Sequence, residues 1–218
     1  MPDVNQARLW YPEEDPTHGF SHILRVYRLG EYLAEKEGGN LRIVRAAALL
    51  HDAADESNPR QDHHQAAAQF ARRILEEENW SEEAIQAVEH CIRVHRFRDQ
   101  SEKPQTLEAK ILFDADKLDA IGAVGVIRAL GYALQAGEKI FHPPSKQFLE
   151  TGKKEEGEPH TPYHEYHYKL RKLPGLLYTR TGQGLAARRR HVMDLFFEQL
   201  QQEITGETGV GDPGVLID

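Results

Sequence analysis

The sequence predicts an all-α fold, because apolar residues recur with the period of an α-helix along most of its 218 residues. No stretch alternates apolar and polar residues in the way expected of a half-buried strand. Residues that favour helix ends, such as the Gly38-Gly39 pair and Ser81, fall between the periodic segments. We therefore expect a helical bundle.

The segment that begins at Leu41 is apolar almost all round, which predicts a buried central helix. Ser81 and Thr106 are expected N-caps, since a hydroxyl there can accept from the first free backbone N–H groups of a helix. The expected helices cover about 18 or 21 to 37, 41–54, 61–78, 82–95, 107–118, 121–135, 163–177 and 184–203.

Residues 141–162 interrupt this pattern with Pro143-Pro144, a charged run around Lys153-Lys154 and few apolar side chains. Such a composition predicts a long, mobile loop. The expected organisation is a helical core over 15–140, this loop over 141–162, a C-terminal helical pair over 163–205 that folds back on the core, and a flexible tail over 206–218.

The net charge of −8 predicts repulsion of phosphate backbones, so no stable nucleic-acid complex is expected, although a local basic cluster could still bind a small phosphorylated ligand. No apolar run approaches the length of a membrane span, and the first residues lack the apolar core of a secretory signal. Cys91 is the only cysteine, which excludes an internal disulfide and a multi-cysteine zinc site. We expect a cytoplasmic protein without membrane association.

His22, the His51-Asp52 pair and Asp116 form the most informative pattern. His22 lies on the apolar side of its helix, and His51-Asp52 closes the most apolar helix of the chain. The side chains of consecutive helical residues point about 100° apart. His51 and Asp52 can therefore bind the same ion only if it lies in a groove between two helices. Buried imidazoles and carboxylates need compensation, and a divalent cation would supply it.

Each part of this pattern has an ordinary alternative. His22 alone can be a core histidine, a His-Asp dipeptide occurs by chance, and the acidic segment 114–119 can be a solvated helix surface with Lys117 as its partner. Nitrogen and oxygen ligands suit Mn, Fe, Co, Ni or Zn, and softness alone does not choose among these metals.

The order His, His-Asp, Asp resembles the HD superfamily of metal-dependent phosphohydrolases. The similar segments are HGFSHILRVYRLGEYLA (18–34), AALLHDAAD (47–55), DADKLDAIGAVGVIRAL (114–130), YHEYHYKLRKL (163–173) and TRTGQGLAARR (179–189). The last two are similar to a bacterial branch of compact HD proteins that includes nucleoside-triphosphate pyrophosphohydrolases. The resemblance covers about 15–203.

This resemblance implies that His22, His51, Asp52 and Asp116 hold a divalent ion (Mn, Co, Ni, Fe, Mg or Zn), with His18 as the rival for the first position. Asp119 shares the face of Asp116 and is expected to support the ligands. Asp55 is the candidate general base, with a surface carboxylate as the alternative. Lys169 and Lys172 are predicted to clamp phosphates from one helix face, and His95 to contact phosphate at the pocket edge.

The function implied is hydrolysis of a nucleotide-like small molecule, with a nucleoside triphosphate cleaved to monophosphate and pyrophosphate as the leading hypothesis. A 5′-nucleotidase or phosphodiesterase of the same superfamily is the next. A diiron oxygenase would need further ligands from His63, His64, His90 or His95, and a non-catalytic nucleotide sensor is the remaining alternative. The apolar residues of the last helix are core or the seam of a homodimer.

Overall fold

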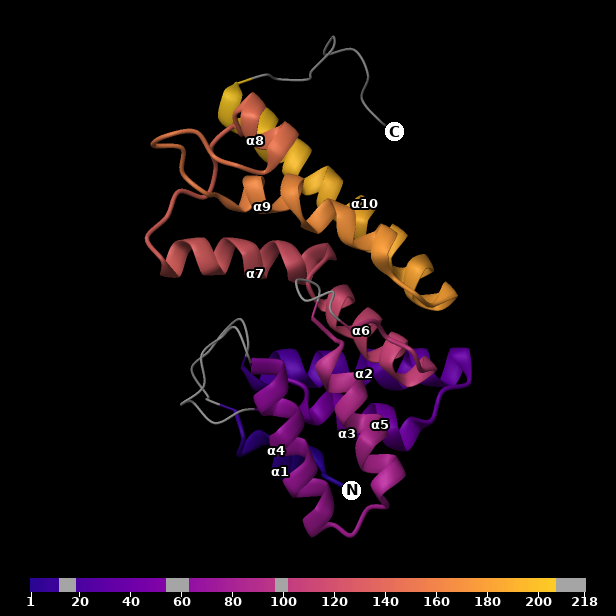
Figure 1. Cartoon of the computed structure of the whole chain (residues 1–218). Coiled ribbons are helices and arrows are strands. Elements are labelled where there is room, and N and C mark those ends of the chain that lie inside the picture. Colours follow the sequence, from indigo (N-terminus) through magenta and orange to yellow (C-terminus); the bar gives the residue numbers. More distant parts are fainter. Residues whose placement is uncertain (12–18, 54–62, 97–101, 207–218) are drawn as a thin grey trace.

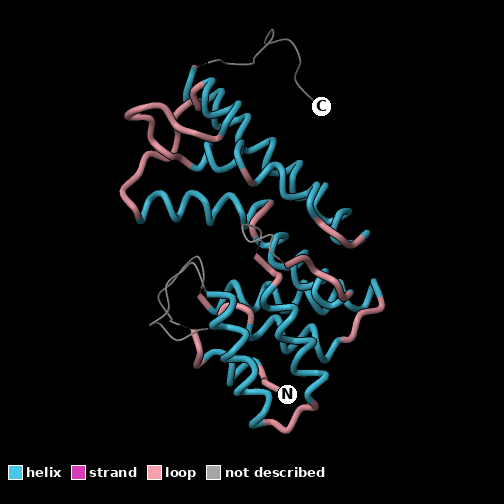
Figure 2. Tube along the Cα trace, in the orientation of Figure 1, coloured by secondary structure: helices cyan, strands magenta, loops and turns pink. Residues whose placement is uncertain are grey.

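In the computed structural model, the described residues are 1–11, 19–53, 63–96 and 102–206. All their regular secondary structure is helical, and Figure 2 shows helices and loops with no strand in these ranges. The all-α prediction is confirmed. The elements are α1 (Val4–Arg8), α2 (Phe20–Glu37), α3 (Leu41–Leu50), α4 (His63–Glu77), α5 (Glu82–Arg93), α6 (Leu107–Asp119), α7 (Gly122–Gln135), α8 (Lys146–Thr151), α9 (Pro162–Tyr168), the 3-10 helix η1 (Leu170–Leu176) and α10 (Arg180–Thr205).

The α3 helix is central to the lower group of helices in Figure 1, where it packs against α1, α2, α4, α5 and α6. Its seven buried residues include the unbroken run from Ala46 to Leu50. Small alanines on α3 let the neighbouring helices approach closely. The prediction of a buried central helix is confirmed, and its end, where His51 and Asp52 follow, lies inside the bundle.

Helix ends follow the expected local chemistry. The side chains of Ser81 and Thr106 accept from the backbone N–H of Ala84 and Ala109. Gly38 ends α2 with φ of 81°, a left-handed conformation that favours glycine. The small N-terminal helix α1 was not predicted, and it packs on α3.

A second group of helices, α7 to α10, lies over the first (Figure 1). The long α10 helix contacts α2, α6 and α7, so it joins the two groups. Asp114 of α6 is fully buried, and it accepts hydrogen bonds from Tyr178 N (2.9 Å), Thr179 N (2.7 Å) and Thr179 Oγ1 (2.6 Å). This carboxylate therefore fixes the start of α10 against the core.

The expected loop over 141–162 is in part wrong, because it contains α8 and buries Phe148. The Glu158 carboxylate organises the segment by accepting from Ser145 N (2.7 Å), Ser145 Oγ (2.8 Å) and Glu155 N (2.7 Å). His164 of α9 lies 3.0 Å from the same carboxylate. Polar composition here reflects an internal hydrogen-bond network that the sequence pattern did not reveal.

The helix expected over 163–177 is also wrong in its extent. The α9 helix ends at Tyr168, Lys169 has φ −124° and ψ −60°, and the chain continues as η1 with Pro174 inside it. Proline lacks the N–H needed for α-helical hydrogen bonding, which favours the change. The tail over 207–218 lies outside the described residues.

Within the described ranges, no single helix is long and apolar enough to cross a membrane. The pair α6 and α7 reaches that length and apolarity only together, and the chain bends by 62° between them.

We predict opposite effects of alanine at two glycines of α10. A Cβ at Gly182 would lie 2.5 Å from Asp114 Oδ2 and 2.7 Å from Thr179 Oγ1, whereas a Cβ at Gly184 meets no atom within 4 Å. Gly182→Ala should lower the free energy of unfolding by roughly 1–3 kcal/mol through overpacking. Gly184→Ala should raise it by about 0.5–1 kcal/mol through helix propensity. Urea unfolding of both variants checks this, and equal effects would contradict the close approach.

Candidate metal centre

His22 lies in the first turn of α2, and two carboxylates of α6 contact its two ring nitrogens. Nδ1 lies 2.7 Å from Asp119 Oδ2, and Nε2 lies 3.5 Å from Asp116 Oδ1. Asp116 and Asp119 are three residues apart, so the one-turn spacing expected from the sequence lets them approach the same imidazole. The side chain of His22 is only 2 % exposed.

His51 and Asp52 complete the cluster from the end of α3. His51 Nε2 lies 3.4 Å from His22 Nε2 and 3.6 Å from Asp52 Oδ2. His22 Nε2 lies 3.7 Å from the same carboxylate oxygen. His22, His51 and Asp52 each present a ligand atom within 4.8 Å of the others, so they could hold a metal ion.

The hydrogen bonds on Nδ1 decide what the two imidazoles present to each other. His51 Nδ1 lies 2.9 Å from the Ala48 carbonyl oxygen, which can only accept, so Nδ1 donates. His22 Nδ1 likewise donates to the ionised Asp119. With both rings neutral in this tautomer, each Nε2 presents a lone pair, and the two Nε2 atoms lie 3.4 Å apart beside the Asp52 carboxylate.

This arrangement of lone pairs is unfavourable without a positive charge between them, and it fits a divalent cation. Two ligands about 2.1 Å from one ion lie roughly 3–3.5 Å apart, close to the separations in the cluster. Asp116 is also near, but its other oxygen accepts a hydrogen bond from the buried Lys117. Its role as a fourth ligand stays a prediction.

Asp119 links the cluster to two arginines that the sequence analysis did not identify. Arg25 donates through Nε to Asp119 Oδ1 (2.6 Å), and Arg128 donates to Oδ2 (2.6 Å). Burial raises the pKa of Asp119, but the hydrogen bonds from His22 and Arg25 outweigh it and bring the pKa to about 2. The carboxylate is therefore ionised and orients His22, as a hydrogen-bonded neighbour of a metal ligand does.

Arg25 could have been found from the sequence, because it lies one turn after His22 on the same helix. Arg128 gives no such signal, because it reaches Asp119 only through the bend between α6 and α7. Its guanidinium also lies 3.3 Å from His22 Nδ1.

His95 lies beside the cluster rather than at an exposed edge. Its side chain is 5 % exposed, its Nε2 lies 3.5 Å from Asp52 Oδ1, and its ring centroid is 5.2 Å from that of His51. His90, considered as an additional ligand, lies 2.8 Å from Glu102 and accepts from Gln105 N. His18 and Asp55 lie outside the described residues.

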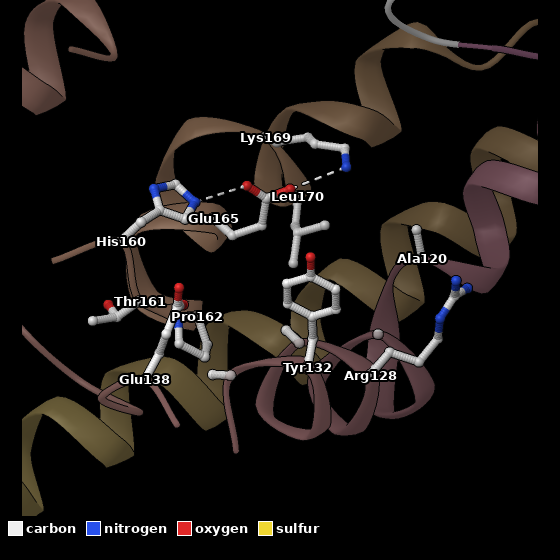
Figure 3. Close-up of a pocket in the computed structure, with 13 residues that line it drawn as sticks. Ala120, Arg128, Tyr132, Glu138, His160, Thr161, Pro162, Glu165, Lys169 and Leu170 are labelled. Atoms are coloured by element: carbon white, nitrogen blue, oxygen red, sulfur yellow. Dashed lines mark hydrogen bonds and ion pairs between the residues drawn. The ribbon is translucent and has the colours of Figure 1, made fainter. Parts of the chain in front are cut away.

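Arg128 also lines a cavity of about 510 Å³ between α7 and α9. In Figure 3, Tyr132 rises from α7 toward the side of the cavity that carries His160, Glu165 and Lys169, whereas Arg128 extends toward Ala120. Lys169 Nζ lies 3.0 Å from Glu165, and Glu165 also contacts His160 at 3.3 Å. This cavity therefore adjoins the candidate metal cluster through Arg128, which contacts Asp119.

Lys172 does not line that cavity. Because α9 ends at Tyr168, Lys172 lies on η1 and lines a different cavity with Phe148, Tyr168 and Arg171. The prediction that Lys169 and Lys172 clamp one phosphate chain from a shared helix face is therefore wrong in its geometry.

The chain is similar to known proteins that contain an HD domain. The HD domain family model matches residues 19–121, which include every residue of the cluster. The uncharacterized protein YpgQ of Bacillus subtilis is 30 % identical over 94 % of this chain and 96 % of its own length.

Solved structures are similar over almost the whole chain. The crystal structure of Bacillus subtilis YpgQ in complex with ADP has a TM-score of 0.71 at 29 % identity and covers 96 % of this chain and 100 % of its own. A Lactobacillus plantarum protein has a TM-score of 0.73 at 34 % identity, with 93 % and 95 % covered. An HD-superfamily hydrolase from Bacillus thuringiensis has a TM-score of 0.70 at 28 % identity, with 93 % and 96 % covered.

We predict that His51 makes the metal-free protein less stable in acid. Burial lowers the pKa of His51 from 6.5 to about 4, so between these values the unfolded chain binds a proton that the folded protein excludes. The free energy of unfolding should therefore fall as the pH is lowered from about 6.5 to about 4, by at most about 3 kcal/mol from this group.

Urea unfolding of the metal-free protein at several pH values measures this dependence. His51→Gln should flatten it, whereas His191→Gln, at an exposed position on α10, should leave it unchanged. If the free energy of unfolding of His51→Gln depends on pH as steeply as that of the wild type, the dependence does not come from His51.

Proposed function

Because the chain belongs to the HD-domain superfamily and is a hydrolase, we propose that it cleaves a nucleoside triphosphate with water to a nucleoside monophosphate and pyrophosphate. The observation that carries the proposal is the close approach of His22 Nε2 and His51 Nε2, which lie 3.4 Å apart beside the Asp52 carboxylate. Buried acceptors in this arrangement favour a divalent cation, and the cluster adjoins a cavity with basic side chains.

We propose His22, His51, Asp52 and Asp116 as the residues that hold the ion. Bound there, a divalent ion would lower the pKa of a bound water and offset charge that develops on phosphorus. The protein supplies the orientation: Asp119 holds the His22 ring through Nδ1, and the Ala48 carbonyl holds the His51 ring. Asp55 stays the candidate base on the strength of the sequence alone.

The cavity beside the cluster supports a substrate that is larger than one phosphate. Arg128 lies at the wall shared with the cluster, and Lys169 lies farther along the same cavity. A phosphate chain that starts at the ion could contact both cations, and the exposed ring of Tyr132 offers a surface for a base. The solved complex of the similar YpgQ protein with ADP supports a nucleotide in this family.

We predict that the wild-type protein binds close to one transition-metal ion per chain. Asp52→Ala and Asp116→Ala should each lose the ion, because each removes a negative charge beside it. Glu31→Ala is the matched control, since this carboxylate of α2 pairs with Arg45 instead. Elemental analysis of the purified proteins measures the content. Equal metal in all four proteins would reject the site, and two ions per chain would favour the diiron alternative.

We predict that Lys169→Ala lowers kcat/KM for nucleoside triphosphates by roughly tenfold or more, since a charge-assisted contact contributes about 1.5–3 kcal/mol. Hydrolysis of a nucleoside monophosphate should change little, because its single phosphate lies at the ion. Lys146→Ala is the control, as Lys146 pairs with Glu150 at the same i, i+4 spacing that joins Lys169 to Glu165.

Initial rates on matched triphosphate and monophosphate substrates, with Mn, Co, Ni, Mg or Zn added, measure this effect. Release of pyrophosphate rather than phosphate supports the proposed reaction. Phosphate release from monophosphates, with no effect of Lys169→Ala on any substrate, would favour the 5′-nucleotidase.

A further inference from the structure

A second cavity, of about 680 Å³, lies between η1, α8 and α10. Its lining includes Arg171, Lys172 and Arg190, against the single carboxylate of Glu150. That carboxylate lies 3.8 Å from Lys146 on its own helix. The cavity is therefore positively charged, although the chain as a whole carries a net charge of −8.

Arg171 and Lys172 form no ion pair with a carboxylate within the described residues. Arg171 lies over the Tyr166 ring (5.6 Å) and contacts His167 Nδ1 (3.4 Å), while Lys172 Nζ lies over the Tyr168 ring (5.1 Å). Burial, followed by the charge of Arg171, lowers the pKa of His167, so this ring is neutral near pH 7. The donors of both cations remain available to an anion.

A third cavity, of about 470 Å³, adjoins the second along α10. It shares Gly175 and Arg190 with the second cavity, and its lining adds His191 and Asp194. A Cβ at Gly175 would meet no atom within 4 Å, so the surface is open where the two cavities join. Arg190 pairs with Asp194 through Nε (3.2 Å), which holds its guanidinium at the junction.

We infer that this groove, which we define by Arg171, Lys172, Gly175 and Arg190, binds the di- or triphosphate chain of a small anion at a site separate from the metal centre. An elongated polyanion matches cations spread along a groove better than a single phosphate does.

The Tyr168 ring at the groove is half-exposed, and its neighbours cover part of it. Lys172 covers the ring of Tyr168 on one side, and the backbone of Gly152 packs so closely that a Cβ there would lie 2.1 Å from this ring. The proposed recognition rests on the phosphates, which a free polyphosphate and a nucleotide share.

The experiment is isothermal titration calorimetry of the metal-free full-length protein with inorganic tripolyphosphate at low ionic strength. Lys172→Gln and Arg171→Gln should each weaken binding roughly tenfold. Lys36→Gln is the matched control, because Lys36 lies over the half-exposed Tyr32 ring (5.8 Å) on α2 as Lys172 does over Tyr168. Binding that is equal in wild type and Lys172→Gln, or equally weakened by Lys36→Gln, would overturn the inference.

A charge-neutral pair of variants separates a shaped groove from general attraction. Gly175→Leu places a side chain in the groove and should weaken tripolyphosphate binding, whereas Gly184→Leu, also at an open position, should not. Lys169→Gln changes a residue of the cavity beside the metal centre. This variant should retain the part of the tripolyphosphate affinity that Lys172→Gln removes.

Parallel titrations with ATP identify the source of the phosphates. Equal Lys172-dependent affinity for ATP and tripolyphosphate assigns the site to the phosphate chain alone, and tighter ATP binding assigns it to a nucleotide. If Lys172→Gln changes the affinity for neither ATP nor tripolyphosphate, the inference is overturned.

Discussion

The structure depends on the imidazoles of His22 and His51, whose Nε2 atoms lie 3.4 Å apart inside the helical bundle. Each ring is fixed by its other nitrogen, His51 by the Ala48 carbonyl and His22 by Asp119. Because these anchors belong to α3 and α6, the contact is possible only where α2, α3 and α6 pack together. A cation bound by both Nε2 atoms would relieve the repulsion between their lone pairs and would link α2, α3 and α6.

The acidic residues of α6 contribute both to the candidate metal centre and to the packing of α10 on the core. Asp116 and Asp119 face His22, whereas Asp114 faces the start of α10 and accepts three hydrogen bonds there. Asp119 extends the centre outward through Arg128, whose side chain also lines the neighbouring cavity. The α6 helix thus connects the candidate metal cluster, the proposed substrate cavity and the start of the C-terminal helix.

Lys169 and Lys172 lie three residues apart in the sequence, but they line different cavities. The change from α9 to η1 turns Lys169 toward the cavity beside the cluster and Lys172 toward the groove with Arg171. Basic residues close in sequence therefore belong to different surfaces.

The sequence by itself determined the helical class, the caps at Ser81 and Thr106, and the convergence of His22, His51 and Asp52. The helical class and the caps rest on local periodicity and on the chemistry of helix ends, and the choice of His22, His51 and Asp52 also rests on the resemblance to the HD superfamily. Only the tertiary structure decided that Arg128 meets Asp119, that 141–162 folds around Glu158, and that Lys172 leaves the cavity of Lys169. Long-range pairing and a local change of helix type leave no periodic trace, because they depend on which surfaces meet after folding.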